Sequence, residues 1–369
     1  MPTETAATPP TTRPGVIALC WRDPTVVMLV GLICVSILFF GFFAPARFLS
    51  AETLRSMAFQ MPELGVLALA MMIPLMSGGL NLAIIATANL SALVMAAILT
   101  RLIAPGTSPV AEGSAVALAL AAGFTTAFTI GFITGAIVAF LRVHPILVTL
   151  GTMTAVKGLS VYSTNGGVIG GFPSVILFLG NGSLLGIPAS MILFLLCAIL
   201  VGVMMNNTPF GVSVRMIGSN ERATRYSGVP TGWILVWVYV FSSLLCWVAA
   251  MVMMARFNSA RAGYAESYLL ITILAAVLGG IDPNGGFGKV LGLTLSLVLL
   301  QVISTGFNLL GLSPHLTEAI WGATMILAIA VGVVREQLTS RVWLRRTRDS
   351  ESARSAGVVP GETGVRQKI

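Results

Sequence analysis

An uncharged run, Leu64–Thr100, decides how this chain folds, and it reads LGVLALAMMIPLMSGGLNLAIIATANLSALVMAAILT. A helix of roughly 20 apolar residues crosses the hydrocarbon core of a bilayer, so the run is too long for one crossing. The sequence SGGLN at residues 77–81 interrupts the run with two glycines, a residue type that commonly ends helices. The run therefore predicts two membrane-spanning helices that are separated at the double glycine, the first of them short.

The composition of the whole chain also indicates a membrane protein. Of its 369 residues, 56% are hydrophobic and 9% are charged, whereas soluble domains carry about 25% charged residues. The net charge of +8 is typical of a membrane protein whose Lys and Arg face the cytoplasm, so it does not require a nucleic-acid partner. The four cysteines and two histidines are scattered along the chain, which predicts no metal site.

Apolar runs recur along residues 25–334 and predict one all-α, polytopic membrane domain of about ten spanning helices. The segment Ala51–Met61 is weakly amphipathic and predicts a separate surface element. The segment Ser163–Pro188 predicts a re-entrant or external interfacial element, because its apolar middle is too short to span. Besides the two helices of the opening run, the predicted spans are Thr25–Ala44, Ser114–Leu141, Pro145–Tyr162, Ala189–Met205, Gly232–Ala255, Ser267–Leu278, Val290–Gly311 and Thr317–Val334.

The two ends of the chain differ from this domain in composition. Residues 1–24 are rich in Pro and Thr and predict a disordered cytoplasmic tail, and residues 335–369 predict a basic cytoplasmic tail that meets membrane lipid. Ten spans place both tails on the same side, and the distribution of Lys and Arg selects the cytoplasm. The external segments then hold only Arg47, Arg55, Arg101, Arg256 and Arg261, with Lys157 near an external helix end.

Glycines inside the predicted spans indicate where helices pack or break. Gly131 and Gly135 are four residues apart in one span, a spacing that allows a second helix to approach closely. The chain has a second double glycine in a similar motif. The sequences GGLN at 78–81 and GGID at 279–282 share a pattern and predict equivalent breaks. These structural breaks are Gly78, Gly79, Gly279 and Gly280.

The segment Asn206–Thr231 is a polar island between two apolar regions, and the predicted orientation places it in the cytoplasm. It holds Arg215, Glu221, Arg222 and Arg225, whereas the regions on either side are uncharged over long distances. Two interpretations stay open on physical grounds. The island is either a docking surface for another protein or an ordinary loop.

Within the island, the sequence predicts a short capped helix at Glu221–Ser227. Asn220 is suited to cap it, because an Asn side chain accepts hydrogen bonds from the free N–H groups of a first turn. Glu221 stands where the helix dipole favours a negative charge, and it can pair with Arg225 one turn later. Gly228 supplies the stop.

The chain offers no set of side chains for catalysis inside the membrane. Its acidic residues in this region fall at predicted helix ends, which argues against an ion-driven carrier and against intramembrane hydrolysis. The sequence GGFGKV at 285–290 resembles a phosphate-binding loop but lacks the Ser or Thr after Lys and the preceding strand. We therefore predict that the chain is not an enzyme and that any ATPase is another protein. The acidic residues are Glu63, Glu112, Glu266, Asp282 and Glu318.

Four motifs in this order are similar to those of a known family: SGGLNL at 77–82, VTLGTMT at 148–154, GSNERA at 218–223 followed by SGV at 227–229, and GGID at 279–282. Together they resemble the ribose/xylose-type permeases of bacterial ABC importers, whose superfamily also holds branched-chain amino acid permeases. The similarity runs from about the first predicted span to the tenth. It implies a type II-like importer permease, a multi-pass protein of the bacterial inner (cytoplasmic) membrane.

The resemblance also implies partners. We expect a second permease copy or a paralogue, two cytoplasmic ATPase subunits that hold ATP and Mg, and a periplasmic or extracellular sugar-binding protein, whereas this chain binds no cofactor. Two residues depart from the family, which usually has Asp in place of Asn81 and a small residue in place of Arg222. The residues that would couple to the ATPase are Asn220, Glu221, Arg222, Ala223, Arg225 and Gly228.

The predicted function is the permease subunit of an ATP-driven importer for a monosaccharide or a related small polar solute, working by alternating access. The alternatives are a permease for branched-chain amino acids or another small solute, and, in a different class, an independent secondary carrier. A membrane-bound transferase would need Asp-rich motifs on cytoplasmic loops, which the sequence lacks. Uncharged polar residues that would line the solute pathway are Asn81, Asn89, Thr149, Thr152 and Ser296.

Overall fold

The computed structural model describes residues 23–103, 108–184, 186–313, 315–324 and 326. The chain divides into two units, Met1–Glu318 and Ala319–Ile369, and nearly all described residues belong to the first. The predicted basic tail, most of the predicted first tail and much of the predicted span Thr317–Val334 lie outside the described residues, although 315–324 is helical.

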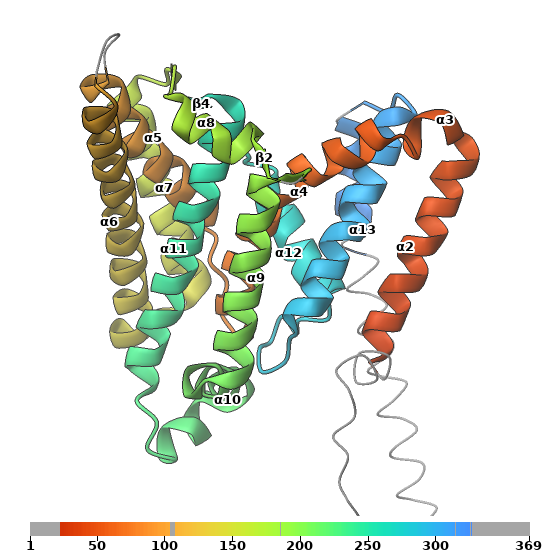
Figure 1. The fold of residues 1–369 in the computed structure, drawn as a ribbon. Helices are drawn as coiled ribbons and strands as arrows, with labels where there is room; N and C mark the ends of the chain where they lie inside the picture. Colours follow the sequence, from red (N-terminus) through yellow and green to blue (C-terminus); the bar gives the residue numbers. More distant parts are fainter. Residues whose placement is uncertain (1–22, 104–107, 185, 314, 325, 327–369) are drawn as a thin grey trace, which may run out of the picture. The chain divides into compact units, whose positions relative to one another are not determined.

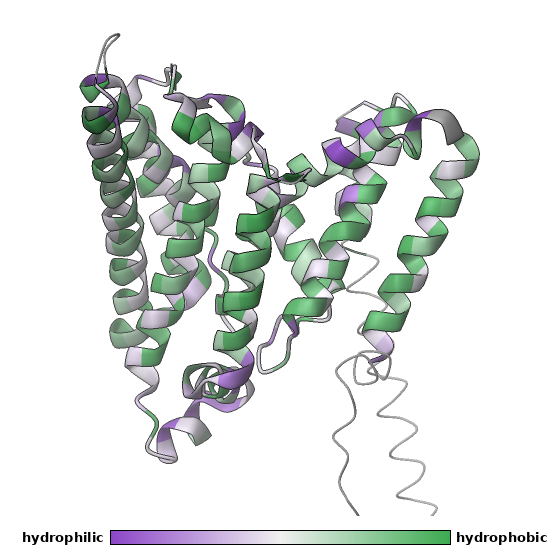
Figure 2. Ribbon diagram, in the orientation of Figure 1, coloured by the Kyte–Doolittle hydropathy of each residue, from purple (hydrophilic) through white to green (hydrophobic). Residues whose placement is uncertain are grey.

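The first unit is an assembly of helices, so the predicted all-α membrane fold is confirmed (Figure 1). Of the described helices, eight are long and apolar enough to cross a membrane, and a ninth, α12, is shorter. In Figure 2 these helices are mostly hydrophobic, and hydrophilic residues gather on α10. The helices are α2 (Pro24–Phe43), α3 (Pro45–Phe48), α4 (Ala51–Met76), α5 (Ile84–Leu102), α6 (Pro109–Leu141), α7 (Pro145–Thr164), α8 (Ser174–Asn181), α9 (Ala189–Asn207), α10 (Pro209–Tyr226), α11 (Thr231–Phe257), α12 (Tyr268–Leu278) and α13 (Val290–Leu309).

Helix α4 lies at the centre of the fold. Every residue from Met61 to Met76 is buried, because α11, α9, α13 and α12 all pack against this helix. The prediction of a separate surface element at Ala51–Met61, followed by a short spanning helix, is wrong. These residues form the first part of α4, and the helix continues through Pro62. Helices in membranes tolerate proline because neighbouring groups satisfy the freed backbone carbonyl, so a proline in the sequence did not mark an end here.

Short elements fill the segment predicted to be interfacial. It contains α8, which has eight residues, and three strands of two residues, two of which pair with each other and one with a strand after α11. None of the elements in this segment is long enough to span a membrane, as expected. The strands are β1 (Ile169–Gly170), which pairs with β4 (Ser259–Ala260), and β2 (Ser183–Leu184), which pairs with β3 (Ile187–Pro188).

The two double glycines end α4 and α12 in the same way. After α4, the N–H groups of Gly78 and Gly79 donate to carbonyls of the last turn, and after α12 the N–H groups of Gly280 and Ile281 do the same. Gly78 and Gly280 both have φ of +81°, a left-handed conformation that is common just after a helix and that glycine adopts more readily than other residues. Gly78 therefore corresponds to Gly280 and not to Gly279. The predicted equivalence of the breaks is confirmed, but the sequence match was out of register by one residue.

Glycines also allow α6 and α11 to approach each other closely. A Cβ on Gly131 would lie 2.8 Å from the carbonyl oxygen of Tyr239, and a Cβ on Gly135 would lie 2.8 Å from that of Val236. Non-bonded carbon and oxygen atoms do not normally come this close, so the two positions need to be free of side chains. The close packing predicted from the spacing of the two glycines is confirmed.

Alanine at both Gly131 and Gly135 is expected to destabilise the protein, because overpacked methyl groups cost about 1–3 kcal/mol. Thermal unfolding of the purified protein in detergent measures the effect as a lower midpoint. The matched control places alanine at both Gly151 and Gly158 of α7, where a Cβ would meet no atom within 4 Å. Alanine is favoured over glycine in a helix by about 0.5–1 kcal/mol, so the control should unfold no earlier than the wild type. Equal midpoints for the two double variants would contradict the close approach.

Candidate functional site

The polar island folds into α10, whose two helical segments meet at Asn220. This residue leaves the helical conformation, with φ of −162° and ψ of 98°. Its Oδ1 accepts a hydrogen bond from the Ala223 N–H at 3.0 Å. Glu221 and Arg225 form the expected ion pair one turn apart, at 2.5 Å. The predicted cap and pair are confirmed, and Gly228 follows them with φ of +81°.

The first segment of α10, residues 209–219, was missed by the sequence prediction. The helix begins at Pro209, and the Thr208 Oγ1 accepts from the Gly211 N–H at 3.3 Å. A capping Thr followed by Pro is a sequence signal for a helix start, and it could have been used here. The first segment buries Gly211, Val214 and Ile217, whereas the second exposes Glu221, Arg222 and Ala223. Thus α10 has an anchored half and an exposed half.

Backbone atoms of three chain segments meet at Gly218, in the anchored half of α10. A Cβ there would overlap both the carbonyl oxygen of Met76, the last residue of α4, and the backbone nitrogen of Gly286. The Gly286 N–H in turn donates to the Met76 carbonyl at 2.9 Å. Gly285 is equally confined, since its Cβ would lie 2.6 Å from the backbone nitrogen of Gly78. We call the contact of Gly218 with Gly78, Gly285 and Gly286 the glycine junction.

The loop in the glycine junction is the sequence that resembles a phosphate-binding loop. Gly285 and Gly286 have φ of +94° and +87°, so their conformation as well as their crowding favours glycine. Asp282 fixes the loop, because its carboxylate accepts from the Asn284 N–H at 2.8 Å and its own N–H donates to the Phe287 carbonyl at 3.1 Å. The glycines therefore serve a contact between backbones, which explains why they cluster in a loop between two apolar helices.

A cavity of about 700 Å³ lies between α10, α11 and the turn from α6 to α7, and the residues at the end of α4 close it. We call it the basic cavity. Three of its charged groups come from the exposed half of α10, and the fourth, that of Arg142, comes from the α6–α7 turn. These residues are far apart in the chain, and no pattern in the sequence groups them. The polar residues that line the cavity include Arg142, His144, Glu221, Arg222, Arg225 and Tyr239.

The five residues predicted to line a solute pathway are buried or half-buried, and each bonds within the protein. The Asn89 amide donates to the carbonyls of Ala262 and Tyr264, both at 2.9 Å, and the Asn81 amide donates to the Ser242 hydroxyl at 2.9 Å. None of the five lines the basic cavity. Thr149, Thr152 and Ser296 each donate to a carbonyl of the preceding turn. Their part in a pathway stays a prediction.

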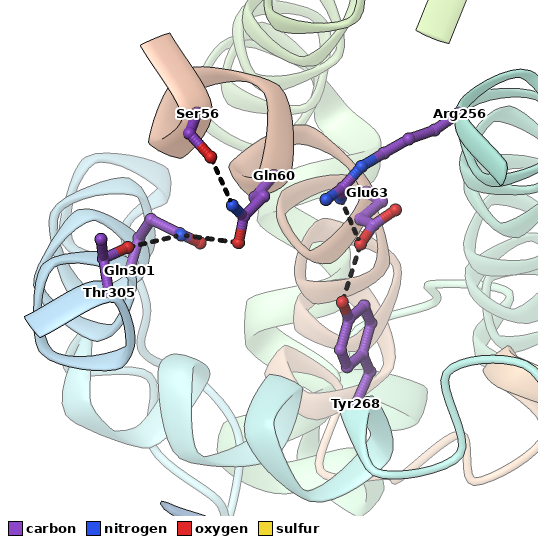
Figure 3. A network of polar contacts seen from close by, with 7 residues as sticks. All are labelled: Ser56, Gln60, Glu63, Arg256, Tyr268, Gln301 and Thr305. Atoms are coloured by element: carbon purple, nitrogen blue, oxygen red, sulfur yellow. Dashed lines mark hydrogen bonds and ion pairs between the residues drawn. The ribbon is translucent and has the colours of Figure 1, made fainter. Parts of the chain in front are cut away.

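One carboxylate lies deep among the helices, so the prediction that the acidic residues fall at helix ends is wrong for Glu63. Glu63 is fully buried near the middle of the 26-residue α4. Its Oε1 accepts from the Tyr268 hydroxyl at 2.7 Å and pairs with the Arg256 Nη1 at 2.8 Å (Figure 3). Its Oε2 has no partner among the described residues. A buried carboxylate requires a compensating charge, and Arg256, in the last turn of α11, supplies it.

Uncharged polar groups continue from this pair toward α13. Gln60 lies one turn before Glu63 on α4, and Gln301 of α13 points toward it, with 3.5 Å between the Gln301 Nε2 and the Gln60 Oε1 (Figure 3). Ser56 and Thr305 complete the chain of contacts, at 2.8 Å from Gln60 and 3.2 Å from Gln301. Since α10 directly precedes the start of α11 and Arg256 lies at its end, this network and α10 belong to opposite ends of α11.

Comparison with known proteins gives the family. A family model described as "Branched-chain amino acid transport system / permease component" matches residues 53–329. The chain belongs to this family. It is a family of transport permeases, and the predicted resemblance to permeases of ABC importers is thereby confirmed.

Curated relatives of two kinds, ribose permeases and autoinducer 2 permeases, match most of the length of this permease. The ribose import permease protein RbsC of Bacillus subtilis (strain 168) is 31% identical over 308 residues, which are 83% of this chain and 90% of that protein. The autoinducer 2 import system permease protein LsrD of Photorhabdus temperata is 27% identical over 340 residues, 90% of this chain and 97% of that protein. LsrD of Salmonella typhi is 29% identical over 336 residues, with shares of 89% and 97%. No solved structure matches the chain.

Replacing Arg256 with Met is expected to lower the free energy of unfolding by about 3–5 kcal/mol, because the Glu63 carboxylate would stay buried without its charge partner. Glu63→Gln in the Arg256→Met background should recover most of that loss, since it removes the uncompensated charge. Unfolding of Arg256→Met, Glu63→Gln and the double variant in detergent measures both effects, and Arg261→Met, at an exposed arginine without an ion pair among the described residues, is the control. If the free energy of unfolding lost in the double variant equalled the sum of the losses in the two single variants, the pairing would be contradicted.

Proposed function

We propose that this permease is the membrane subunit of an ATP-driven ABC importer that takes up a monosaccharide or a related small polar solute. The family and the names of the relatives, which import ribose and autoinducer 2, support this proposal. The glycine junction is the structural observation that supports this function most directly. A helix whose exposed half bears charges, and whose anchored half touches the central helix through backbone atoms, is suited to receive a force from another protein.

The mechanism begins outside this chain. ATP and Mg bind to two cytoplasmic ATPase subunits, and closure of the ATPase pair displaces the exposed half of α10. The ATPase contacts are Asn220, Glu221, Arg222, Ala223, Arg225 and Gly228. This chain contributes no covalent chemistry, so the energy of ATP reaches the solute only as a movement of helices.

The glycine junction passes this movement into the membrane domain. At Gly218 the backbone of α10 lies against the end of α4 and against the loop between α12 and α13, and no flexible side chain absorbs the displacement. Because α4 packs against α9, α11, α12 and α13, a shift at its end changes the packing of most of the central helices. Packed helices move between discrete arrangements, which in this protein are the outward-open and inward-open states.

A neutral solute fits the polar groups of the interior. The buried Glu63 is compensated by Arg256, so the pair presents no net charge to a solute. Uncharged groups such as those of Asn81, Asn89, Thr149, Thr152 and Ser296 remain the proposed contacts, and rearrangement of the helices would expose them to the solute. A second candidate, a branched-chain amino acid, is favoured by the description of the family model. Its ammonium and carboxylate groups would need charged partners or helix ends in the pathway.

The distribution of Lys and Arg supports an orientation with α10 and both tails in the cytoplasm and the Glu63 network toward the outside of the bacterial inner membrane. A soluble sugar-binding protein then delivers the solute to the outer side. A second permease, either a copy of this chain or a paralogue, completes the channel.

Reconstitution into vesicles tests this function. Uptake of labelled ribose is expected only when the permease, its ATPase and its binding protein are all present together with ATP. Uptake by the permease alone would contradict the proposal and favour a secondary carrier. Competition by unlabelled leucine, with no competition by unlabelled sugars, would favour the amino acid candidate.

Glu221→Arg is expected to leave folding intact but to reduce coupled uptake. Glu221 and Arg225 are each about half exposed, with side-chain exposures of 46%, and a surface ion pair contributes only about 0–1 kcal/mol to stability. The substitution therefore acts on the docking surface and not on the fold, because it reverses the charge at residue 221 and breaks the ion pair that holds Arg225 in place. The measurement compares ATP hydrolysis and solute uptake in the reconstituted complex. Glu112→Arg, in the first turn of α6 far along the chain from α10, is the control, and uptake equal to wild type in the Glu221 variant would contradict docking.

A further inference from the structure

We propose that the basic cavity receives an acidic side chain of the partner ATPase, so that the docking surface includes the α6–α7 turn as well as α10. The inference rests on the proposed function, because it assumes that the ATPase meets α10. It adds the chemistry of the partner and a second element of the permease that the partner contacts.

The charges around the cavity are unbalanced. Its arginines are Arg142, Arg222 and Arg225, and its only carboxylate among the lining residues is that of Glu221. This carboxylate already pairs with Arg225. Arg142 and Arg222 are exposed and form no ion pair within the described part of the chain. Two guanidinium groups from different elements thus face one space without a counter-charge.

A buried hydroxyl in the cavity wall also lacks a partner. Tyr239 of α11 is fully buried, and its hydroxyl makes no hydrogen bond to any described residue. Gly79 leaves room for this hydroxyl, since a Cβ on Gly79 would lie 2.7 Å from it. Buried hydroxyl groups are normally bonded, so this hydroxyl is a donor that a docking carboxylate reaches once the cavity wall shifts. A carboxylate can accept from guanidinium groups and from a hydroxyl at the same time.

The backbone at Arg142 adds to the argument. Arg142 ends α6 with φ of +53°, in the left-handed conformation. Asn165 and Asn258 end α7 and α11 in the same conformation, and Asn tolerates it better than most residues. An arginine in this position gives up some backbone stability, and its guanidinium belongs to the lining of the basic cavity. This is the pattern expected where a side chain is retained for a contact.

The position of the cavity favours a protein carboxylate over other anions. Its outer wall is the exposed half of α10, where the ATPase is proposed to dock, and its inner wall is the end of α4 at Ser77, Gly78 and Gly79. A carboxylate held between Arg222 and Arg142 would bind α10 to the α6–α7 turn through charge-assisted hydrogen bonds. It would also lie beside the glycine junction, so that the partner contacts both α10 and the end of α4.

Affinity for the ATPase provides the first test. The permease in vesicles of zwitterionic lipid is titrated with its ATPase, and Arg142→Glu, Arg222→Glu and their double variant are compared with wild type. Each single substitution should weaken binding at least about tenfold, the effect of losing one charge-assisted hydrogen bond, and wild-type binding should weaken as salt rises. Arg101→Glu, at the far end of α5, is the control and should bind as wild type does.

A zero-length cross-link provides the second test. Lysine amines couple directly to carboxylates in the presence of a carbodiimide, and the native lysines of the chain are only Lys157, Lys289 and Lys368. The Arg222→Lys and Arg142→Lys variants should each gain a cross-link to an Asp or Glu of the ATPase, identified by mass spectrometry. Arg101→Lys should gain none.

The outcomes separate this inference from the proposed function. If the wild-type permease does not bind the ATPase at all, the proposed function fails. If it binds, but the charge reversals leave affinity unchanged and no cross-link forms at residues 142 or 222, the inference is overturned and docking on α10 stands. If the reversals matter only in vesicles that contain anionic phospholipid, the occupant is a lipid phosphate, and the assignment to the ATPase is overturned.

Discussion

The contact on which the rest of this protein depends is made by backbone atoms at Gly218. Here α10 meets the carbonyl of Met76 and the N–H of Gly286, and any side chain at Gly218 would keep the three segments apart. Contacts between backbones transmit displacement directly, because they contain no rotatable side chain that could relax. The junction therefore links the polar end of the molecule to α4, which is the element that most of the other helices pack against.

The opposite end of α11 is fixed by a different interaction. The Arg256–Glu63 pair and the Tyr268 hydroxyl connect α11, α4 and α12 at a site where Glu63 is fully buried. The amide of Asn89 binds the connection between α11 and α12 to α5. Thus α4 is held by backbone contact at its end near α10 and by a buried ion pair near its middle. A movement that enters at α10 would pivot α4 against this second attachment, which suits a helix that opens one side of the membrane as it closes the other.

The sequence predicted most of the helices and the local structure of the polar island, because both depend on neighbours in the chain. Asn220, Glu221 and Arg225 lie within one or two turns of each other, so their cap and ion pair follow from spacing alone. Glu63 misled the prediction, since a charge beside an apolar run suggests a helix end, and the distant Arg256 supplies the counter-charge that allows Glu63 to be buried inside α4. The glycine junction could not be predicted either. Its members come from three separate segments, and the loop that holds Gly285 and Gly286 resembled a phosphate site when its sequence was considered alone.

The most direct measurement compares ATP hydrolysis with solute uptake in the reconstituted importer that carries Gly218→Ala. The central claim is that backbone contact at Gly218 transmits the movement of α10 to α4. The variant is therefore expected to bind the ATPase and to hydrolyse ATP, while uptake per ATP falls at least about tenfold, an effect of about 1.4 kcal/mol on the transmitted step. Gly151→Ala, at a position with open space, should couple as wild type does. Wild-type uptake per ATP in the Gly218 variant would contradict the account.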